Sequence, residues 1–182
     1  MANKQYYRLD NLLACNCFWM VLIGMRTNGK SYAVKEYTLK KAYEKGEKFV
    51  YLRRWSEDIK TADVASYFDD APVSKITNGE WDSVTAWQGY FYFSTCGDDG
   101  KVKRSTKPIG RYCSLNQAER YKSQVFDVHR LIFEEFLTDK IYLGNRNTKS
   151  EADILLQFVS TIARDRNIQV FMIGSLDRKS VV

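Results

Sequence analysis

One stretch of the chain limits its possible folds more than any other: Gly24-Met25-Arg26-Thr27-Asn28-Gly29-Lys30-Ser31. It reads G-x-x-x-x-G-K-S, the pattern of a loop that joins a buried strand to a helix and surrounds phosphate with backbone N–H groups. Residues 17 to 23 form an apolar run of the length of a parallel strand covered on both faces, and residues 31 to 45 have a helical pattern. The stretch therefore predicts a phosphate-binding loop. A glycine-rich turn with an incidental Lys-Ser pair is the weaker alternative, because both flanking elements are present.

Each part of this loop has an expected role. The glycines let the backbone turn tightly, and the helix N-terminus adds partial positive charge. We expect Lys30 to reach the β- and γ-phosphates of a nucleotide and the Ser31 hydroxyl to bind Mg²⁺. The residues expected to contact the nucleotide are Gly24, Met25, Arg26, Thr27, Asn28, Gly29, Lys30, Ser31, Tyr32 and Arg53.

Length and composition predict one soluble domain over residues 1 to 182. Of the 182 residues, 45% are hydrophobic, which is enough to form a full core. No stretch approaches the ~20 apolar residues of a membrane span, and the first residues do not have the pattern of a signal peptide. We therefore expect an intracellular protein without a membrane partner. The net charge of +6 permits a polyanionic partner without demonstrating one.

The cysteines and the histidine do not predict a metal site. Cys15, Cys17, Cys96 and Cys113 lack C-x-x-C spacing, and His129 is the single histidine. We expect reduced, mostly buried thiols. No acid or serine is placed to form a triad with His129, so this side chain is interpreted as structural.

The segment after the loop predicts a second strand whose end is basic. The first helix is expected to end at Gly46, and residues 48 to 54 form a strand that ends in Arg53 and Arg54. Ligands of open α/β sheets bind at the carboxyl ends of the strands, so both arginines are expected at the same edge as the loop, although a solvated strand end is the alternative. Residues 56 to 69 predict a helix with Ser56 as its N-cap.

Residues 81 to 113 have a different, β-like pattern. Residues 89 to 95 are rich in Tyr and Phe, residues 97 to 100 form a turn, and residues 101 to 106 return as a partner strand. This predicts a hairpin inserted into or attached beside the α/β core. Its basic side chains either contact a phosphate backbone or form a solvated face. They are Lys101, Lys103, Arg104, Lys107 and Arg111.

Two adjacent carboxylates follow a short apolar strand. Residues 131 to 133 are apolar and end at Glu134 and Glu135, an arrangement that resembles the Walker B motif. We expect Glu134 to face Mg²⁺ and Glu135 to face an attacking water. Successive strand residues point to opposite faces, but a turn at the strand end lets both side chains reach one site. A solvent-exposed acidic strand end is the alternative.

A last helix and strand complete the pattern. Residues 150 to 166 form a helix that starts with a capping box at Ser150 and Asp153 and buries Leu155, Phe158, Val159 and Ile162. Residues 169 to 174 form the strand that leads to Ser175. The predicted fold class is α/β, a P-loop NTPase of the additional-strand catalytic-glutamate type. It has a central, mostly parallel sheet flanked by helices and an inserted β-hairpin.

Read in order, these pieces resemble the ATPase domain of the DNA-encapsidation proteins of small podophages, over nearly the whole chain. The resemblance rests on the Gly24-to-Ser31 loop with Tyr32 and Ala33, on residues 49 to 54 and 66 to 68, and on residues 132 to 136. Residues 164 to 166 before the last strand also match. Such proteins use ATP with Mg²⁺ to move double-stranded viral DNA into a procapsid.

The resemblance implies a homo-oligomeric ring, expected to be a pentamer, with a nucleotide at each subunit boundary. In such rings a neighbour's arginine reaches the γ-phosphate. Arg164 is the first candidate and Arg166 the second, although arginine at a helix end is favourable without any partner. Lys122 in the Lys122-Ser123 pair and Arg26 are expected to add positive charge, and Ser175 to sense loss of the phosphate. The implied catalytic set is Glu135, Lys30, Arg164, Arg26 and Lys122.

The implied surroundings are the host cytoplasm and, transiently, the portal vertex of the procapsid, with a packaging RNA as a further partner. The family usually carries a nuclease-like second domain, so the chain is expected to be the ATPase part alone. Two positions depart from the family pattern. Glu134 stands where Asp is usual, which moves the carboxylate by about 1.5 Å, and Leu176 stands where a small polar residue is usual.

Two other functions fit parts of this pattern. A small-molecule or nucleotide kinase has this length and such a loop, but it needs an acceptor pocket and an arginine-rich lid. The Glu134-Glu135 pair is better suited to activating water. A nucleotide-dependent assembly switch without significant turnover is the third possibility, and the Glu134 departure is consistent with it.

Overall fold

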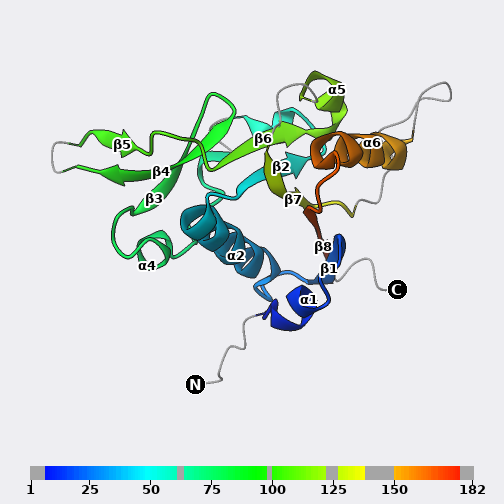
Figure 1. Ribbon diagram of the computed structural model, residues 1–182, viewed down its shortest axis with the longest axis horizontal. Helices are drawn as coiled ribbons and strands as arrows, with labels where there is room; N and C mark the ends of the chain where they lie inside the picture. The colour runs from blue at the N-terminus through cyan, green and yellow to red at the C-terminus, as the bar shows by residue number, and fades with distance from the viewer. Residues whose placement is uncertain (1–6, 61–63, 98–99, 122–126, 138–149, 177–182) are drawn as a thin grey trace.

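A computed structural model of the chain describes residues 7–60, 64–97, 100–121, 127–137 and 150–176. Eight strands in these residues form one sheet. Its parallel part runs in the order β1 (Trp19–Met25), β8 (Gln169–Leu176), β7 (Val128–Glu134), β2 (Lys48–Arg53) and β6 (Gly110–Ser114). This confirms the expected α/β class and the expected mostly parallel sheet (Figure 1).

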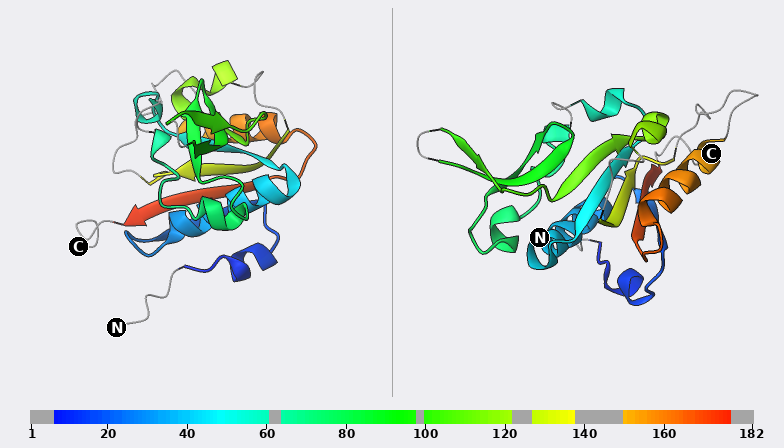
Figure 2. Two further views of the ribbon diagram at one scale, coloured as in Figure 1. Left: turned by 90° about the vertical axis from the view of Figure 1, so that its left-hand side faces the viewer. Right: turned by 45° about the horizontal axis from the view of Figure 1, so that its top comes forward.

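Three antiparallel strands extend the sheet beyond β6. They are β4 (Tyr90–Cys96), β3 (Ser83–Trp87) and β5 (Val102–Arg104). Strand β4 pairs with β6, β3 and β5, so the predicted hairpin of β4 and β5 is present and is attached to the core through β6. Strand β3 had not been predicted from the sequence as a separate strand. These three strands project from one end of the molecule, and we call them the wing (Figure 2).

Helices cover both faces of the parallel part (Figures 1 and 2). Helix α2 (Lys30–Lys45) lies on one face with α1 (Asp10–Ala14), η1 (Glu57–Ile59) and α4 (Val73–Ile76). Helix α6 (Glu151–Ala163) lies on the other face with η2 (Leu115–Gln117) and α5 (Ala118–Tyr121). Strand residues alternate between the two cores, as Tyr51 and Leu52 do.

The ends of the two long helices agree with their sequence signals. Gly46 ends α2 in the left-handed conformation (φ 67°), and its N–H donates to Ala42. Ser150 starts α6 with the expected capping box to Asp153. The predicted stripe on α6 is buried, although the helix ends at Ala163 rather than at residue 166. No helix in the described ranges combines the length and the apolar composition needed to cross a membrane.

The prediction of a helix over residues 56 to 69 was wrong for most of this segment. Residues Glu57–Ile59 form a single 3₁₀ turn, and Ser56 does not cap it; the Ser56 hydroxyl lies 3.2 Å from Glu57 Oε2 instead. Helical geometry returns only at residues 64 and 65 among the described positions. The apolar residues of this segment, Ile59, Val64, Tyr67 and Phe68, are nevertheless buried. The spacing of these apolar residues therefore indicated that they are buried against α2 and the sheet. A turn can bury them there as well as a helix can.

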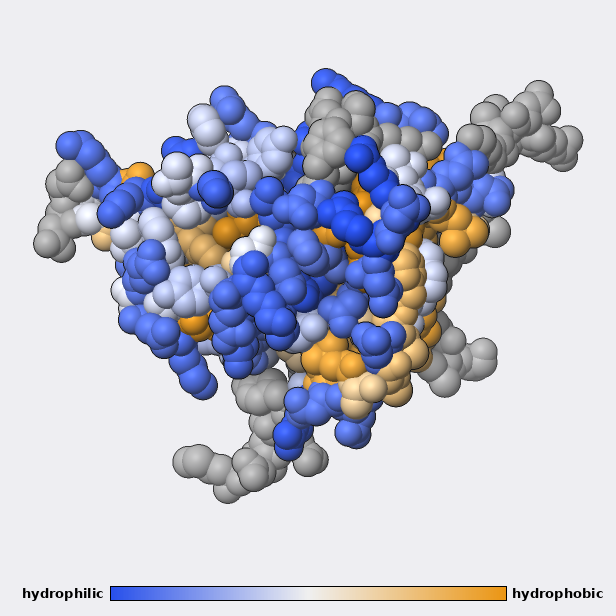
Figure 3. Space-filling model, in the orientation of Figure 1, coloured by the Kyte–Doolittle hydropathy of each residue, from blue (hydrophilic) through white to orange (hydrophobic). Residues whose placement is uncertain are grey.

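Strand β1 also differs from its prediction, because it is covered on one face rather than two in the described structure. Met20 and Leu22 are buried toward α2, but Val21, Ile23 and Met25 on the other face are 52%, 50% and 47% exposed. Strand β1 is at the end of the strand order, and α6 packs over β8, β7 and β2 instead. Apolar residues gather over the region of α1 and β1 in Figure 3.

The cysteines were expected to be mostly buried, and this was wrong for three of the four. Cys15, Cys17 and Cys96 are exposed free thiols, and only Cys113 is buried. The exposed three lie at the end of α1 and at the outer end of β4, where few side chains surround them. Burial raises the pKa of the Cys113 thiol to about 12, so this group stays protonated at neutral pH.

Replacing Gly110 with alanine is expected to lower the melting temperature by on the order of 5 °C. An added Cβ would lie 2.6 Å from the buried Phe49 ring, and the ring cannot move away without displacing Phe68 and Phe91, which pack against it. Thermal unfolding of the variant measures the effect. Adding Phe49→Leu should recover part of the loss, and an unchanged melting temperature for Gly110→Ala alone would contradict this account.

Candidate nucleotide-binding site

The loop between β1 and α2 needs its glycines for steric reasons. Gly29 has φ 82°, a left-handed conformation that glycine adopts without strain, and Thr27 also has positive φ (67°). A Cβ at Gly24 would lie 2.9 Å from the Asn28 amide nitrogen and 3.7 Å from the Lys30 ammonium. The loop is therefore closed tightly around the Lys30 side chain.

Lys30 is the most enclosed charge of this loop. Its Nζ donates to the carbonyl oxygens of Gly24 (3.0 Å) and Met25 (2.8 Å) and to Asn28 Oδ1 (3.0 Å). The residue is only 4% exposed, and this burial lowers the pKa of its ammonium. Three loop oxygens thus occupy the three donors of Lys30, and a phosphate oxygen has to replace at least one of them.

A cavity of about 870 Å³ opens beside this loop, within the range of ligand sites in proteins. It is lined by residues from both termini of the described chain and from three strand ends: Tyr7, Arg8, Arg26, Thr27, Asn28, Gly29, Lys30, Ser31, Tyr32, Ala33, Glu36, Asp70, Glu135 and Ser175. The structure therefore brings Lys30, Glu135 and Ser175 to one cavity, although β8 separates β1 from β7. Five expected residues do not line it: Gly24, Met25, Arg53, Glu134 and Arg164. Lys122 lies outside the described residues.

Glu135 reaches the cavity because the chain turns sharply where β7 ends. Its backbone has φ 53°, a left-handed conformation that non-glycine residues seldom adopt. Its carboxylate accepts a 2.6 Å hydrogen bond from Arg53 Nη2, while Arg53 Nη1 lies 4.0 Å from Glu134 Oε2. Arg53, expected to contact the nucleotide, does not line the cavity, and its guanidinium lies near both carboxylates.

Glu134 faces inward beside two tyrosines. Its side chain is 13% exposed, and its Oε1 is buried without a hydrogen-bond partner among the described residues. The pKa of the Tyr67 hydroxyl is raised by burial and then by the negative charge of Glu134, and the pKa of Tyr51 is raised for the same two reasons. An unpaired buried carboxylate oxygen is costly unless a further ligand completes its contacts. The donor chemistry of Glu134 and of the Ser31 hydroxyl fits Mg²⁺, which prefers oxygen ligands.

The structure separates the two arginines that end β2. Both lie at the carboxyl end of β2, the edge at which they were expected, but Arg54 turns to the opposite face of the sheet and is 7% exposed. There it pairs with Glu151 of α6. Strand alternation explains the difference, because neighbouring residues point to opposite faces.

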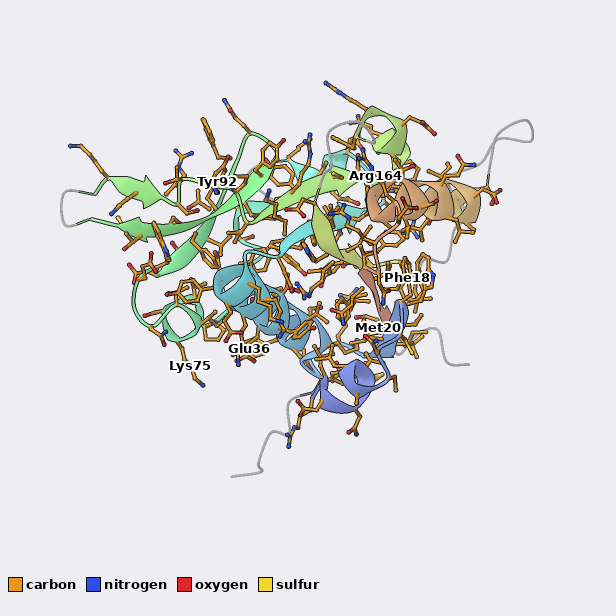
Figure 4. The ribbon with its side chains drawn as sticks, in the orientation of Figure 1. Phe18, Met20, Glu36, Lys75, Tyr92 and Arg164 are labelled. Carbon is orange, nitrogen blue, oxygen red and sulfur yellow. The ribbon has the colours of Figure 1, made fainter. Side chains whose placement is uncertain are left out.

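The two finger candidates lie at the far edge of the sheet. Arg166 Nη1 is 3.2 Å from Asp127 Oδ1, and its Nη2 donates to the Ile162 carbonyl. Arg164 is exposed at the end of α6 with φ 49°. Figure 4 shows it beside α6, across the sheet from Glu36 of α2. Since β8 starts after Arg164 and ends at the cavity, Arg164 is remote from the cavity of its own chain.

Five lining residues had not been anticipated: Ala33, Glu36, Asp70, Tyr7 and Arg8. Glu36 lies on α2 just after the loop, four residues after Tyr32, and this helical spacing from Tyr32 would have indicated it. Asp70 lines the cavity while it pairs with Lys35 at 2.9 Å. Tyr7 and Arg8 come from the segment before α1, where the Tyr7 N–H donates to the Asn28 carbonyl at 3.2 Å. Nothing in the local sequence marks these last three positions.

The basic residues of the wing and of the adjoining residues 107 to 111 are mainly exposed, and two of these arginines stack on aromatic rings of the wing. Arg104 lies 4.7 Å from the Trp87 ring centroid, and Arg111 lies 4.8 Å from that of Tyr90. Lys101, Lys103 and Lys107 are exposed. Such positions suit either a solvated face or a phosphate backbone. His129 is half-buried on β7 and lines no part of the cavity.

Comparison with known proteins identifies the family to which the chain is similar. The family model described as "Podovirus DNA encapsidation protein (Gp16)" matches residues 1–182. The DNA packaging protein of Bacillus phage phi29 is 29% identical over 168 residues, which cover 91% of this chain and 45% of that protein. The chain thus spans less than half the length of this curated relative.

Two solved structures are also similar. The crystal structure of the N-terminal domain of the DNA packaging ATPase from bacteriophage phi29 has a TM-score of 0.72 and 26% identity, covering 94% of this chain and 80% of that one. A chain of the bacteriophage phi29 viral genome packaging motor assembly has a TM-score of 0.70 and 26% identity, covering 94% and 47%. Family model, relative and structures agree along nearly the whole chain, which therefore belongs to the podovirus DNA encapsidation protein (Gp16) family.

Proposed function

We propose that the chain is the ATP-hydrolysing part of a motor that moves double-stranded viral DNA into a procapsid. The observation that carries this proposal is that Lys30, at the start of α2 after β1, and Glu135, directly after β7, line the same cavity although β8 lies between β1 and β7. A phosphate-binding lysine opposite a water-orienting carboxylate is the arrangement that ATP hydrolysis needs. The strand between them suits the additional-strand catalytic-glutamate type of P-loop NTPase. The similar phi29 proteins, a DNA packaging protein and a packaging ATPase domain, support the same role.

In this proposal ATP occupies the cavity with its triphosphate in the Gly24-to-Ser31 loop. The loop residues and Tyr32 bind the nucleotide, with Lys30 leaving some of its loop oxygens to contact the β- and γ-phosphates. Ser31 and Glu134 would hold Mg²⁺, directly or through water. When bound, Mg²⁺ neutralises phosphate charge and polarises the γ-phosphate. Arg26, at the cavity wall, adds positive charge.

Glu135 has the proposed role of orienting the attacking water. The water O–H donates to the Glu135 carboxylate while its oxygen attacks the γ-phosphorus, and the bond to the β-phosphate oxygen breaks to give ADP and phosphate. In the structure this carboxylate is bonded to Arg53, so it has to leave Arg53 or share it with the water. Ser175, at the end of β8, lines the cavity where it would contact the phosphate.

Phosphate release tests the proposed reaction. Purified protein with ATP and Mg²⁺ should release inorganic phosphate without any added acceptor, and the rate should rise with double-stranded DNA and procapsids. Release that requires a small-molecule acceptor would instead indicate a kinase. Binding of ATP without any release in all conditions would indicate an assembly switch.

We further propose that the working form is a ring, a pentamer in this proposal. It acts at the procapsid portal in the host cytoplasm with a packaging RNA, and Arg164 completes the site of the neighbouring subunit. The position of Arg164, exposed and remote from its own cavity, supports a role in another subunit rather than in its own.

Arg164→Ala is expected to reduce hydrolysis by the assembled ring on the order of a thousandfold. Mixing this variant with Glu135→Gln subunits should restore part of the rate, because some boundaries then combine an intact Glu135 with a neighbour's intact Arg164. Steady-state phosphate release of the mixtures measures this. A loss that no mixture relieves would contradict a role across the boundary.

A further inference from the structure

Arg54 holds the turn that carries Glu135. Its guanidinium donates from Nη1 to the Glu135 carbonyl at 3.1 Å and from Nη2 to the Phe136 carbonyl at 2.7 Å. The same group pairs with Glu151, the first residue of α6, with Nε 2.9 Å and Nη2 2.8 Å from Oε1. The Arg54 side chain is 8% exposed. One buried cation thus joins the end of β2, the turn after β7 and the start of α6.

Strand β8 holds the opposite side of this turn. The Phe136 N–H donates to the Ile173 carbonyl at 3.3 Å. Gly174 lies so close to the turn that a Cβ there would be 2.6 Å from Leu137 and 3.0 Å from Phe136. The left-handed backbone of Glu135 is therefore fixed from both sides, by Arg54 and by β8.

We propose that Arg54 is a positioning residue for Glu135: it keeps the backbone of Glu135 in the conformation that sends the carboxylate into the cavity. This inference rests on the proposed role of Glu135 in hydrolysis. A strained conformation persists only where its surroundings enforce it, and the Arg54 contacts to two successive carbonyls are suited to that. Arginine fits this place because its planar fork of donors serves a carboxylate and two carbonyls together, which a lysine ammonium cannot do in one geometry.

The chain offers a matched control for this proposal. Arg130, at the start of β7, pairs with Glu47, and the side-chain exposures of the two pairs are nearly equal: 8% and 20% for Arg54 and Glu151, and 5% and 20% for Arg130 and Glu47. Arg130 lies at the edge of the sheet opposite to the cavity. Arg54→Lys and Arg130→Lys therefore remove the same chemical group from similarly buried ion pairs, one at the turn and one far from it.

The experiment compares the two lysine variants in phosphate release and in binding of a non-hydrolysable ATP analogue. Both variants should lower the melting temperature by similar amounts. Arg54→Lys should lower kcat by about a hundredfold, the effect of misplacing a catalytic group by about 1 Å, with KM and analogue affinity within about twofold. Arg130→Lys should keep the native kcat. Equal kcat values for the two variants, or a loss confined to KM, would overturn the proposal.

A second experiment, in Glu135→Gln protein, distinguishes a positioning role of Arg54 from a general loss of structure. In Glu135→Gln protein, adding Arg54→Lys should cause no further loss of residual hydrolysis, because the group through which Arg54 acts is already gone. A further loss as large as in native protein would overturn the proposal. If Arg54→Lys does not fold, Glu151→Gln takes its place, because it keeps Arg54 but weakens the ion pair that holds it. Glu151→Gln should lower kcat by a smaller factor. A native kcat in this variant would count against the proposal.

Hydrogen exchange gives a readout that does not depend on turnover. Amides of residues 134 to 137 should exchange faster in Arg54→Lys than in native protein and should be unchanged in Arg130→Lys. Unchanged exchange in Arg54→Lys would overturn the proposal. If native protein releases no phosphate, the proposed function fails, while the exchange data still decide whether Arg54 holds the turn.

Discussion

Glu135→Gln protein should hydrolyse ATP at least about a hundredfold more slowly than native protein, while it still binds ATP with nearly native affinity. Glutamine has the shape of glutamate but no negative charge to accept the hydrogen bond of an attacking water strongly. The Glu135 side chain is 63% exposed and contacts Arg53, so the substitution disturbs little packing. Phosphate release and analogue binding, measured on the same preparation, separate the two effects.

The matched control for this variant is Glu44→Gln, which changes an exposed acid on α2 that pairs with Lys40 away from the cavity. It should hydrolyse ATP at the native rate. Equal, near-zero rates of ATP hydrolysis by native protein and by Glu135→Gln would favour the assembly switch over the motor. Reduced affinity in Glu135→Gln without reduced kcat would assign Glu135 to binding rather than to catalysis.

Lys30→Ala should abolish detectable hydrolysis and weaken ATP binding on the order of a hundredfold or more, since charge-assisted hydrogen bonds to phosphate are lost. The structure adds a second cause. The Lys30 ammonium donates to the carbonyls of Gly24 and Met25 and to the Asn28 side chain, so alanine removes one donor from each of these three oxygens. The loop should therefore lose its closed shape even without nucleotide.

Isothermal titration with an ATP analogue measures this loss, and Lys40→Ala is the control on the same helix. Lys40 is exposed and pairs with Glu44, so its loss should leave affinity unchanged. Native-like affinity in Lys30→Ala would contradict the assignment of the loop as the phosphate site. Hydrogen exchange across residues 24 to 31 would show whether the loop itself has opened.

The parts of the fold that were predictable from sequence are those whose structure is determined by residues close together in the chain. The order of β1, loop and α2 follows from the glycine spacing between an apolar run and a helical pattern. Ser150 and Asp153 start α6 by a capping box that involves neighbours in sequence only. The strand ending at Glu134 was recognisable because its apolar run is bounded by charge. These features depend little on what packs around them.

The features that were not predictable depend on contacts between distant segments. The apolar residues around Tyr67 are buried without a long helix, because the α2 face of the sheet accepts them in a turn. Tyr7 and Asp70 line the cavity because the fold brings them there from far along the chain. The division of roles between Arg53 and Arg54 required knowing what lies on each face of β2.

The half-exposed apolar side of β1 has a practical consequence. Val21, Ile23 and Met25 form a strip on a strand at the end of the described sheet, and no charged residue interrupts β1. Natural sheets commonly protect such edges with lysine or proline, since an unprotected one invites edge-to-edge association with other chains. Preparations of this protein should therefore be kept dilute. Surface engineering for solubility should change the outward Val21 and Ile23 and leave the inward Met20 and Leu22 intact.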